Sequence, residues 1–594
     1  MTRRTRWRVT PALQEESATL SRALGLRPLV AQLLAARGFG TPEAAEAFLR
    51  PALTQLHDPF GLLGMEAAAQ RVTQALEAGE AITVYGDYDV DGVTSTAILV
   101  DFLRACGAQV EAYIPRRLVE GYGLNVGAVD TIAEAGAGLL ITCDCGVTAV
   151  EEVDHAVSRG LDVIIIDHHR APAVLPRAVA ILNPYQPGCT FPFQHLAAVG
   201  VSFNLLMALR KTLREAGFFQ RRGRAEPLLK PYLELVALGT VADVVPLVDE
   251  NRVFVAEGLK LLERSARPGV VALKEVAGLG EGAVSAGQVG FQLGPRINAA
   301  GRLDDARAGL ELLLTRDPAR ARALATLLDE ANQARRDIEA QIGEAAAALA
   351  GEAPSARGLV LVGEGWHRGV VGIVASRMVE RYSRPALVLG VEDGVAKGSG
   401  RSFGDFHLYD ALKACEAHLT RFGGHRAAAG LELPASALPA FIAAFEAQCE
   451  AQLSEEALVP SLAVDAILPL PEVDEGLVAS LAQLEPFGMG NPAPVFASQG
   501  PFWGGRVVGA PRNGRPAHLK GRIGDLDVIG FGMADRMGFA QDGEVQAAFN
   551  LGFNTFRGRT TLQATLRDLA PEGEVEVVEA PRPGPRDAYG HVHD

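Results

Sequence analysis

Between residues 81 and 169 the chain alternates short apolar segments with longer amphipathic ones, and this pattern limits the possible folds more than any other feature. The apolar segments have the length and composition of buried strands, and the segments between them have the periodicity of helices. This alternation predicts a parallel sheet with helices on both faces, which is an α/β fold. The predicted strands are residues 81–87, 109–115, 138–144 and 161–169, and the predicted helices are residues 94–107, 128–136 and 148–160.

The rest of the chain changes character several times, so we expect several domains in its 594 residues. Residues 305–350 are nearly all helix formers, with Pro318 at a break. A second α/β pattern follows, and then alternating polar and apolar residues with glycine turns predict a small all-β barrel. The expected parts are an N-terminal helical extension (1–60), a first α/β domain (61–265), a connecting helical segment (266–355), a second α/β domain (356–458), a barrel (459–572) and a disordered tail (573–594).

Composition excludes some classes of protein. The net charge of −15 argues against a chain coated all over by nucleic acid, although a local basic groove remains compatible with it. No signal-peptide pattern is seen, and no apolar run approaches the roughly 20 residues needed to span a bilayer. Cys143 and Cys145 form a lone C-x-C, which disfavours a zinc site. We expect a reduced, cytoplasmic protein without membrane contact.

Acids and imidazoles follow three of the predicted strands, where sites form in open parallel sheets. In an extended segment, residues two apart point the same way, so Asp89 and Asp91 are expected to face one point. Crowded carboxylates repel one another unless cations neutralise them, and oxygen ligands with imidazoles suit a pair of Mn²⁺ or Mg²⁺ ions. The strand-end residues are Asp87, Asp89, Asp91, Asp144, Asp167, His168 and His169.

A further acid, Asp243, interrupts an apolar helix or helix end, where an unpaired charge would be costly. One Asp at a strand end is often only a helix cap or a turn residue, so the prediction of a metal site depends on the whole set. The segment "DYDVDG" also matches the start of a calcium EF-hand loop. That loop needs Glu at its twelfth position, where this chain has Ile98, and we reject it.

The motifs "DYDVDG", "CDCG", "DHH" and "GTVADVVPL" resemble those of the DHH phosphoesterase superfamily. Further segments, including "EGYGLN", "GPRINAAGRLDDA", "GWHRGVVGIVASR", "KGSGRS", "FGGHRAAAG" and "LEPFGMGNPAPVF", resemble the RecJ family of exonucleases. The resemblance implies a DHH catalytic domain, a DHH-associated domain and an OB-fold domain at the three predicted domains. It also implies a 5′→3′ exonuclease that hydrolyses single-stranded DNA in recombination and repair, with two Mn²⁺ or Mg²⁺ ions per site.

Carried over residue by residue, the resemblance implies roles for the strand-end side chains. His169 matches a histidine placed over the scissile phosphate, Asp144 is expected to bridge the ions, and Asp167 is expected to orient the two histidines. Pyrophosphatase relatives have a ligand histidine where this chain has Tyr85, so Asp87 or water is expected to substitute for it. The implied metal ligands are Asp89, Asp91, Asp144, His168 and Asp243.

Glycine-rich segments elsewhere are expected to hold DNA phosphates, because backbone N–H groups at glycines can approach an anion closely. "KGSGRS" is expected to form a loop in which Ser399 and Arg401 seat the 5′ end, although solvated turns would give the same pattern. The candidate contacts are Arg296, Asn298, Arg302, Lys397, Ser399, Arg401, Gly423, Gly424 and His425.

Aromatic residues of the predicted barrel are candidates for stacking on bases, although such residues more often belong to a core. They are Phe502, Trp503, Phe549, Phe553 and Phe556, with Arg557 and Arg559 alongside.

Two alternatives remain open. One is another enzyme of the superfamily that cleaves short oligonucleotides or cyclic dinucleotides, which the long helix and the barrel disfavour, since small substrates need no such track. The other is a non-enzymatic scaffold that has lost its ligands, which the intact set of acids disfavours. The expected partner is single-stranded DNA, with a single-strand-binding protein and repair helicases as candidates, and the expected state is a monomer.

Overall fold

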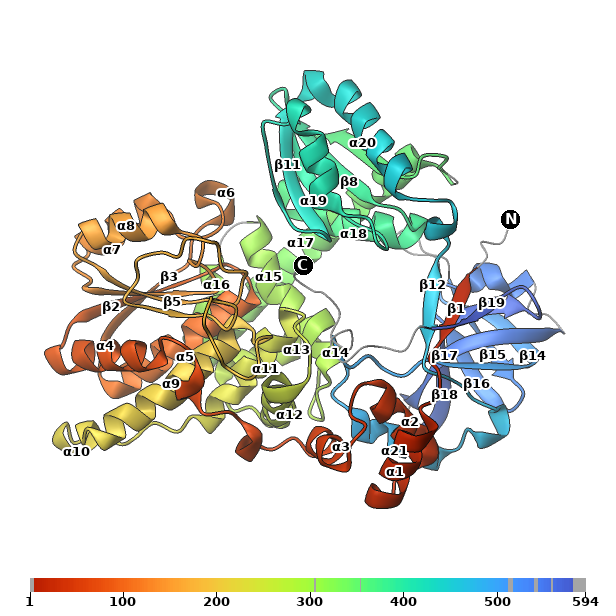
Figure 1. Ribbon diagram of the computed structural model, residues 1–594, viewed down its shortest axis with the longest axis horizontal. Helices are drawn as coiled ribbons and strands as arrows, with labels where there is room; N and C mark the ends of the chain where they lie inside the picture. Colours follow the sequence, from red (N-terminus) through yellow and green to blue (C-terminus); the bar gives the residue numbers. More distant parts are fainter. Residues whose placement is uncertain are drawn as a thin grey trace. The chain divides into compact units, whose positions relative to one another are not determined.

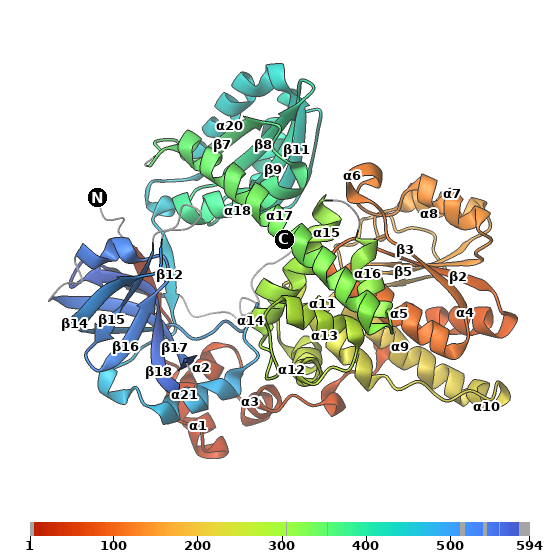
Figure 2. The same cartoon turned by 180° about the vertical axis from the view of Figure 1, so that it is seen from behind.

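The structure is a computed structural model that describes residues 5–303, 306–352, 354–510, 517–538, 543–556 and 559–580. The chain divides into two units (Figures 1 and 2). We call the first the parallel-sheet unit; it comprises Arg50–Arg335 and Pro486–Asn491. The second, the barrel unit, comprises Met1–Leu49, Arg336–Glu485 and Pro492–Asp594.

The parallel-sheet unit is built on five strands in the order β3–β2–β4–β5–β6, and every neighbouring pair is parallel. The three central strands are buried along nearly their whole length, which explains why their sequences are apolar without alternation. The strands are β2 (Ala81–Gly86), β3 (Gln109–Tyr113), β4 (Leu139–Cys143), β5 (Asp162–Ile166) and β6 (Ala180–Leu182).

Helices cover both faces of this sheet, which confirms the predicted α/β fold. Helices α7 (Val126–Glu134) and α8 (Val150–Ser158) pack on one face through a core that includes Val129 and Val153. Helices α4 (Met65–Ala78), α5 (Val90–Cys106) and α9 (Ala198–Glu215) lie on the other face, as Figure 1 shows. Parallel strands with helical crossovers bring all the strand ends that precede helices to one edge.

The remaining helices of the unit follow the sheet in sequence. The longer ones are α11 (Leu233–Ala242), α12 (Asp249–Glu263), α13 (Pro268–Val276), α15 (Gly294–Leu303) and α16 (Arg307–Leu314), with a π-helical turn at Val289–Leu293. Helix α17 (Pro318–Ala350) then runs into the barrel unit. Proline at its first position confirms the predicted break, since Pro318 starts a helix well but cannot continue one.

The barrel unit holds a second sheet of five strands in the order β10–β11–β9–β8–β7, with helices α18 (Arg368–Tyr382), α19 (Leu408–Ala414) and α20 (Leu438–Gln452). Only β7 and β8 are parallel; the other pairs are antiparallel. The strands are β7 (Leu359–Glu364), β8 (Ala386–Glu392), β9 (Val395–Arg401), β10 (Arg421–Gly424) and β11 (Ala428–Pro434).

The C-terminal sheet is the predicted barrel. Strand β14 pairs with both β15 and β17, β15 pairs with β16, β16 pairs with β18, and β18 pairs with β17, so the strands form a closed ring. The ring strands are β14 (Phe496–Val508), β15 (His518–Ile523), β16 (Leu526–Gly530), β17 (Glu544–Phe556) and β18 (Arg559–Pro571), with the short β13 (Ala466–Ile467) beside β14.

Both ends of the chain depart from the prediction. The N-terminal segment was expected to be helical, and it does contain α1 (Gln14–Leu24), α2 (Pro28–Ala36) and α3 (Pro42–Leu49). It begins, however, with strand β1 (Arg6–Val9), which pairs in parallel with β12 (Ser461–Val464) and with β19 (Glu576–Glu579).

The pairing of β1 has a tertiary cause. Trp7 is buried, and its indole N–H donates to Asp568 at 2.9 Å. Strand β19 lies inside the tail that was expected to be disordered, and that expectation is wrong for residues 576–579 because β1 supplies their hydrogen-bond partners. Residues 581–594 of the predicted tail lie outside the described residues. In the part of the chain that is described, no helix is both long and apolar enough to cross a bilayer.

Candidate metal centre

The predicted acids and histidines converge at one edge of the parallel sheet. Asp87 and Asp89 follow β2, Asp144 follows β4, His168 follows β5, and Asp243 ends α11. Among the described residues, three groups of side chains place potential ligand atoms within 4.8 Å of one another. The groups are Asp87, Asp89 and Asp144; Asp91, His168 and Asp243; and Asp144, His168 and His169.

The loop after β2 does not have the extended geometry that was expected for Asp89 and Asp91. Asp89 is the N-cap of α5, and its carboxylate accepts hydrogen bonds from the amides of Asp91 (2.9 Å) and Gly92 (3.1 Å). Asp91 already lies in the first helical turn, so the two acids fall into different ligand groups. The expectation of one shared point is wrong because the helix begins between them.

Gly92 is required by this turn. A Cβ atom at position 92 would lie 2.5 Å from the carbonyl oxygen of Asp87 and 2.6 Å from its amide nitrogen. Those distances are far shorter than van der Waals contact, so any side chain would push Asp87 away from Asp89. The glycine of "DYDVDG" therefore serves the local packing of the acids.

Both carboxylate oxygens of Asp91 are held by the start of α9. The Ala198 amide donates to one at 2.6 Å and the Val199 amide to the other at 2.8 Å. A helix N-terminus stabilises negative charge through its free amides and its dipole. No sequence pattern signalled this contact, because α9 lies far from Asp91 along the chain.

Asp144 is the acid common to two ligand groups. Its backbone is left-handed (φ 62°), a conformation that is uncommon for a residue other than glycine and that recurs at functional sites. The residue is 2% exposed, and its side chain is directed between the loop after β2 and the histidines that follow β5. This central place matches the expected bridging position.

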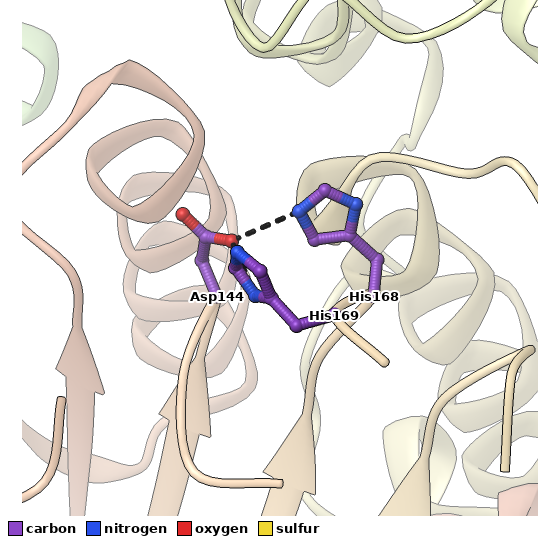
Figure 3. Close-up of side chains that lie close together, drawn as sticks. All are labelled: Asp144, His168 and His169. Atoms are coloured by element: carbon purple, nitrogen blue, oxygen red, sulfur yellow. Dashed lines mark ion pairs between the residues drawn. The ribbon is translucent and has the colours of Figure 1, made fainter. Parts of the chain in front are cut away.

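His168 and His169 point to different surroundings, as Figure 3 shows. His168 Nε2 lies 3.2 Å from Asp144 Oδ1, 3.6 Å from Asp243 Oδ2 and 3.9 Å from an oxygen of Asp91, and the ring is buried. His169 Nδ1 lies 3.8 Å from Asp144, and 37% of its side chain is exposed. His168 is thus surrounded by carboxylates, whereas His169 faces outward beside them.

Asp167 holds the two histidines in place. Its Oδ1 accepts the backbone amides of His168 (2.8 Å) and His169 (3.1 Å) and lies 2.7 Å from His169 Nδ1, and Oδ2 accepts the amide of Val147 (3.0 Å). Burial alone would raise the pKa of Asp167, but the hydrogen bond and charge of His169 together with the amides lower it to about 2. The expected orienting role of Asp167 agrees with this geometry.

The same contact affects His169. Burial opposes its charged form, but the hydrogen bond and the negative charge of Asp167, helped by Asp89 and Asp87, raise its pKa to about 9. The other nitrogen of the ring can then donate a proton or a hydrogen bond from a charged imidazolium at neutral pH.

The acids around Asp144 repel one another. Burial, followed by repulsion from Asp89 and Asp91, raises the pKa of Asp144 well above its usual value. Burial and the charge of Asp91 do the same for Asp243, and burial with the charge of Asp89 raises the pKa of Asp91 to about 7. So many buried acids are costly unless a positive charge lies among them.

The donor set fits a hard divalent cation. The buried atoms Asp144 Oδ1 and Asp243 Oδ2 accept no hydrogen bond from any residue that the structure describes. Buried carboxylate oxygens in that state are expensive unless an ion takes the missing bonds. Carboxylate oxygens with one or two imidazoles favour Mn²⁺ or Mg²⁺, and none of the six free cysteines belongs to a ligand group found among the described residues.

Two tyrosines near the centre have other tasks. Tyr85 donates its hydroxyl hydrogen bond to the carbonyl of Gly123 at 2.8 Å and stacks on Tyr113, so Asp87 is the nearer candidate for the missing histidine ligand. Tyr122, which the prediction did not single out, donates to the carbonyl of Asp144 at 3.3 Å, and its ring edge faces His169 with centroids 6.1 Å apart. Its motif "EGYGLN" was the available signal.

Three of the predicted DNA contacts lie in the parallel-sheet unit, and each has different neighbours. Arg296 is 9% exposed and donates to Asp329 (2.9 Å) and to the carbonyls of Gln292 (2.6 Å) and Val276 (3.2 Å), which is an internal structural role. Asn298 accepts the amide of Val90 at 3.0 Å and so fixes the loop between Asp89 and Asp91. Arg302 lies in the last turn of α15, and its contact with a DNA phosphate stays a prediction.

In the barrel unit, "KGSGRS" is not the expected loop but part of strand β9, which lies between β8 and β11. Its glycines serve strand packing, since a Cβ at position 398 would lie 2.0 Å from the carbonyl oxygen of Val388. Lys397 pairs with Glu432 at 2.9 Å. Ser399 Oγ and Arg401 Nη2 would each lie 3.3 Å from a Cβ at Gly372, so both side chains reach the same part of α18.

The remaining predicted residues of this unit lie on a hairpin. Gly423 and Gly424 are the last residues of β10, and the amide of His425 donates to the carbonyl of Ala428 at 2.8 Å. Gly424 has φ 142°, and a Cβ there would lie 2.4 Å from the same carbonyl. The glycine is thus explained by a tight turn, and phosphate binding by this hairpin stays a prediction.

The barrel aromatics divide into two sets. Phe502 and Phe549 are fully buried and belong to the core, so they cannot stack on bases. Trp503 is 45% exposed beneath the Arg522 guanidinium (4.7 Å to the ring centroid), and Phe553 is 48% exposed. Arg559 is exposed, whereas the side chain of Phe556 and all of Arg557 lie outside the described residues.

Comparison with known proteins agrees with this geometry. Family models match three segments: the N-terminal domain of the DHH family at residues 81–240, the DHHA1 domain at residues 355–451, and the RecJ OB domain at residues 464–568. The single-stranded-DNA-specific exonuclease RecJ of Bacillus subtilis is 38% identical over 570 residues, which cover 95% of this chain and 71% of that protein.

Solved structures show the same similarity. RecJ from Thermus thermophilus in complex with Mn²⁺ superposes with a TM-score of 0.82 at 34% identity, covering 98% of this chain and 82% of that one. Its complex with Mg²⁺ gives a TM-score of 0.76 at 33% identity, with 96% and 79% covered. Both ions are those that the donor set favours.

Proposed function

The chain belongs to the RecJ family, and on this premise we propose that it is a metal-dependent exonuclease that degrades single-stranded DNA by hydrolysing phosphodiester bonds. The observation that supports this most directly is the position of Asp144, which forms a ligand group with Asp87 and Asp89 and also lies 3.2 Å from His168 Nε2. Asp144 would belong to both ligand sets, and divalent ions held by them would supply positive charge to the attacking and leaving oxygens of a phosphodiester. The intact ligand set argues against a scaffold that has lost its activity.

The residues divide into two ligand sets. When bound, Mn²⁺ or Mg²⁺ supplies positive charge to the phosphoryl oxygens and makes water a stronger nucleophile. The chain contributes a buried, fixed arrangement of acids, which avoids reorganisation during the reaction. We assign one set to Asp87, Asp89 and Asp144. We build the other by adding Asp144, whose Oδ1 lies 3.2 Å from His168 Nε2, to the group of Asp91, His168 and Asp243.

His169 is assigned to the phosphate itself. Its Nδ1 is held by Asp167, so Nε2 is the nitrogen available to a substrate. The hydrogen bond and charge of Asp167 raise the pKa of His169 and favour the charged ring, which can donate a hydrogen bond to a phosphoryl oxygen or a proton to the leaving sugar oxygen. His169 is 37% exposed, which leaves its ring accessible to a substrate.

The 5′→3′ polarity requires a group that accepts a terminal phosphate, and we assign this to Ser399 and Arg401. Both side chains lie against Gly372 near the start of α18, where the absence of a side chain leaves room. Burial lowers the pKa of Arg401, which is the cost of holding a guanidinium away from water until an anion binds. A charge-assisted pair between arginine and phosphate would recover that cost.

The three domains have separate proposed roles. We assign catalysis to residues 61–265, end recognition to residues 356–458 and strand binding to the barrel of residues 459–572, with Trp503 and Phe553 as stacking candidates. We further propose a cytoplasmic monomer that acts in recombination and repair, with a single-strand-binding protein and repair helicases as candidate partners.

The proposal is tested by digestion of end-labelled DNA. Single-stranded and duplex oligonucleotides, labelled at either end, are incubated with Mn²⁺, Mg²⁺ or EDTA. The expected result is loss of single strands only, with early release of a 5′-labelled mononucleotide and gradual shortening of 3′-labelled strands. Equal cleavage of duplexes, internal cuts or activity in EDTA would contradict the proposal.

End recognition has a separate test with matched oligonucleotides that differ only in a 5′-phosphate. Arg401→Ala is expected to lower kcat/KM on the phosphorylated strand by roughly 10–150-fold, the equivalent of about 1.5–3 kcal/mol for a bond to a charged group, and to change the 5′-hydroxyl strand much less. Arg357→Ala is the control, since that arginine donates to the backbone carbonyls of Glu450 and Leu453 in the same unit. An unchanged phosphate preference in Arg401→Ala would show that the pocket lies elsewhere.

A further inference from the structure

A segment without helix or strand, residues 183–197, connects β6 to α9 and is linked to three separate parts of the metal centre. Its first residue, Asn183, is fully buried, and its side-chain N–H donates to the backbone carbonyl of His169 at 2.8 Å. The Asn183 side-chain carbonyl oxygen accepts the amide of Tyr185 at 2.8 Å, so the side chain is fixed from both ends.

The hydrogen bonds continue from Tyr185 toward Asp243. The Tyr185 hydroxyl lies 2.7 Å from His195 Nδ1. The carbonyl of His195 accepts the side-chain N–H of Asn251 at 2.6 Å, and the same Asn251 nitrogen donates to Pro246 at 3.0 Å. Pro246 lies in the loop that follows Asp243, so this network joins the histidine loop to the loop of another ligand.

The segment ends at the third part of the centre. Residue 197 is followed by Ala198 and Val199, whose amides hold Asp91. The same stretch of chain thus fixes the backbone of His169 at its start, is joined through Asn251 to the Asp243 loop near its end, and leads into the helix that binds Asp91. A structureless segment of this length inside a compact domain is uncommon, and such segments are often functional.

We propose that Asn183 is a positioning residue for His169 and that residues 183–197 act as a frame that fixes the relative positions of the histidine loop, Asp91 and Asp243. Asp167 fixes the ring of His169 and its amide, and Asn183 fixes its carbonyl. Loss of the Asn183 bond would leave a carbonyl unpaired and let the backbone of the proposed phosphate-contacting residue shift. A shift of about 1 Å in a reacting group can cost on the order of 100-fold in rate.

The inference rests on the proposed nuclease function and on the assignment of His169 to the phosphate. If Asn183 acts through His169, its removal should affect turnover but not metal binding or DNA binding. It should also have no further effect once the His169 side chain is gone. A residue that only stabilised the fold would lower the amount of folded enzyme, and its effect would multiply with that of His169→Ala.

The experiment is a double-mutant cycle on the full chain, with wild type, Asn183→Ala, His169→Ala and the double variant. Steady-state cleavage of a 5′-phosphorylated single strand is measured in saturating Mn²⁺, and Mn²⁺ affinity is measured by calorimetry. Asn183→Ala is expected to lower kcat about 10–100-fold while KM and Mn²⁺ affinity stay within about twofold. The double variant is expected to match His169→Ala.

Asn204→Ala is the matched control, because Asn204 is also fully buried and donates to Gly200 (3.1 Å) and Glu250 (3.2 Å). It should lower thermal stability yet keep the wild-type kcat. If Asn183→Ala does not fold, Asn183→Asp keeps the side-chain volume and the acceptor for Tyr185 and is expected to show the same fall in kcat.

The possible results distinguish failure of the positioning role of Asn183 from failure of the proposed nuclease function. A wild-type kcat in Asn183→Ala or Asn183→Asp, or losses that multiply in the double variant, would overturn the positioning role. An equal loss of Mn²⁺ affinity would also overturn it, since Asn183 would then support the metal ligands rather than His169. A wild-type protein that cleaves no DNA would instead overturn the proposed function.

Discussion

Replacing Asp144 with Asn should make the metal-free protein more stable while abolishing its activity, an unusual combination for a buried substitution. Asparagine has nearly the same volume and removes the negative charge. In the group of Asp87, Asp89 and Asp144, potential ligand oxygens lie within 4.8 Å of one another. Two unit charges at that distance repel by about 3.5 kcal/mol at an effective dielectric constant of about 20.

Only part of that repulsion will appear as stability. The raised pKa of Asp144 means that the metal-free centre takes up protons, which already relieves some of the repulsion. We therefore expect Asp144→Asn to raise the free energy of unfolding in EDTA by about 1–2 kcal/mol, or a few degrees in Tm. In Mn²⁺ the order should reverse, because the wild type gains binding energy that the variant lacks.

The assays are thermal unfolding in EDTA and in Mn²⁺, and single-strand cleavage in Mn²⁺. Activity should fall more than about 10³-fold, which corresponds to roughly 4 kcal/mol of transition-state stabilisation. Asp162→Asn is the matched control: it lies in the same sheet, is half-exposed and pairs with Arg71, so it should give neither a gain in stability nor a loss of rate. A variant that retains a tenth of the activity, or that melts below wild type in EDTA, would refute the bridging role.

Other sites give three more predictions. Burial raises the pKa of Glu250 from 4.5 to about 7, so the folded protein holds this proton more tightly than the unfolded chain does. In EDTA, the Tm of the wild type should therefore fall relative to that of Glu250→Gln as the pH rises from about 5 to 8. Parallel curves of Tm against pH for the two proteins would contradict this. His168→Ala should lose both Mn²⁺ affinity and turnover, whereas His169→Ala should lose turnover alone. An equal loss of Mn²⁺ affinity in both variants, measured by calorimetry, would show that the two histidines do not have separate roles. Trp503→Ala should weaken binding of a long single strand by about 1–3 kcal/mol but spare cleavage of a very short one, and unchanged affinity by fluorescence anisotropy would exclude stacking there.

The order of strands and helices could be predicted because it is written in local periodicity. The apolar runs at β2, β4 and β5 and the helices between them occur where the sequence predicts them, since burial on both faces leaves few polar positions in a strand. The acids and histidines of the metal centre were also predictable, because parallel strands bring their carboxyl ends to one edge whatever the details of packing.

Other features depend on contacts that the local sequence does not encode. Strands β1 and β19 form because each supplies the other with hydrogen-bond partners from the opposite end of the chain. Phe502 is buried and the adjacent Trp503 is exposed because neighbouring residues of a strand point to opposite faces, and only closure of the barrel decides which face is inside.

The same limit applies within the metal centre. The sequence by itself determined that Asp89, Asp91, Asp144 and His168 would meet, but not that a helix begins between Asp89 and Asp91 and sends them to different ligand groups. Only the tertiary structure decided that Asn183 would fix the backbone of His169, since that contact depends on where β6 ends beside β5. Local patterns state which residues a strand will present, whereas the packing of distant segments determines what those residues touch.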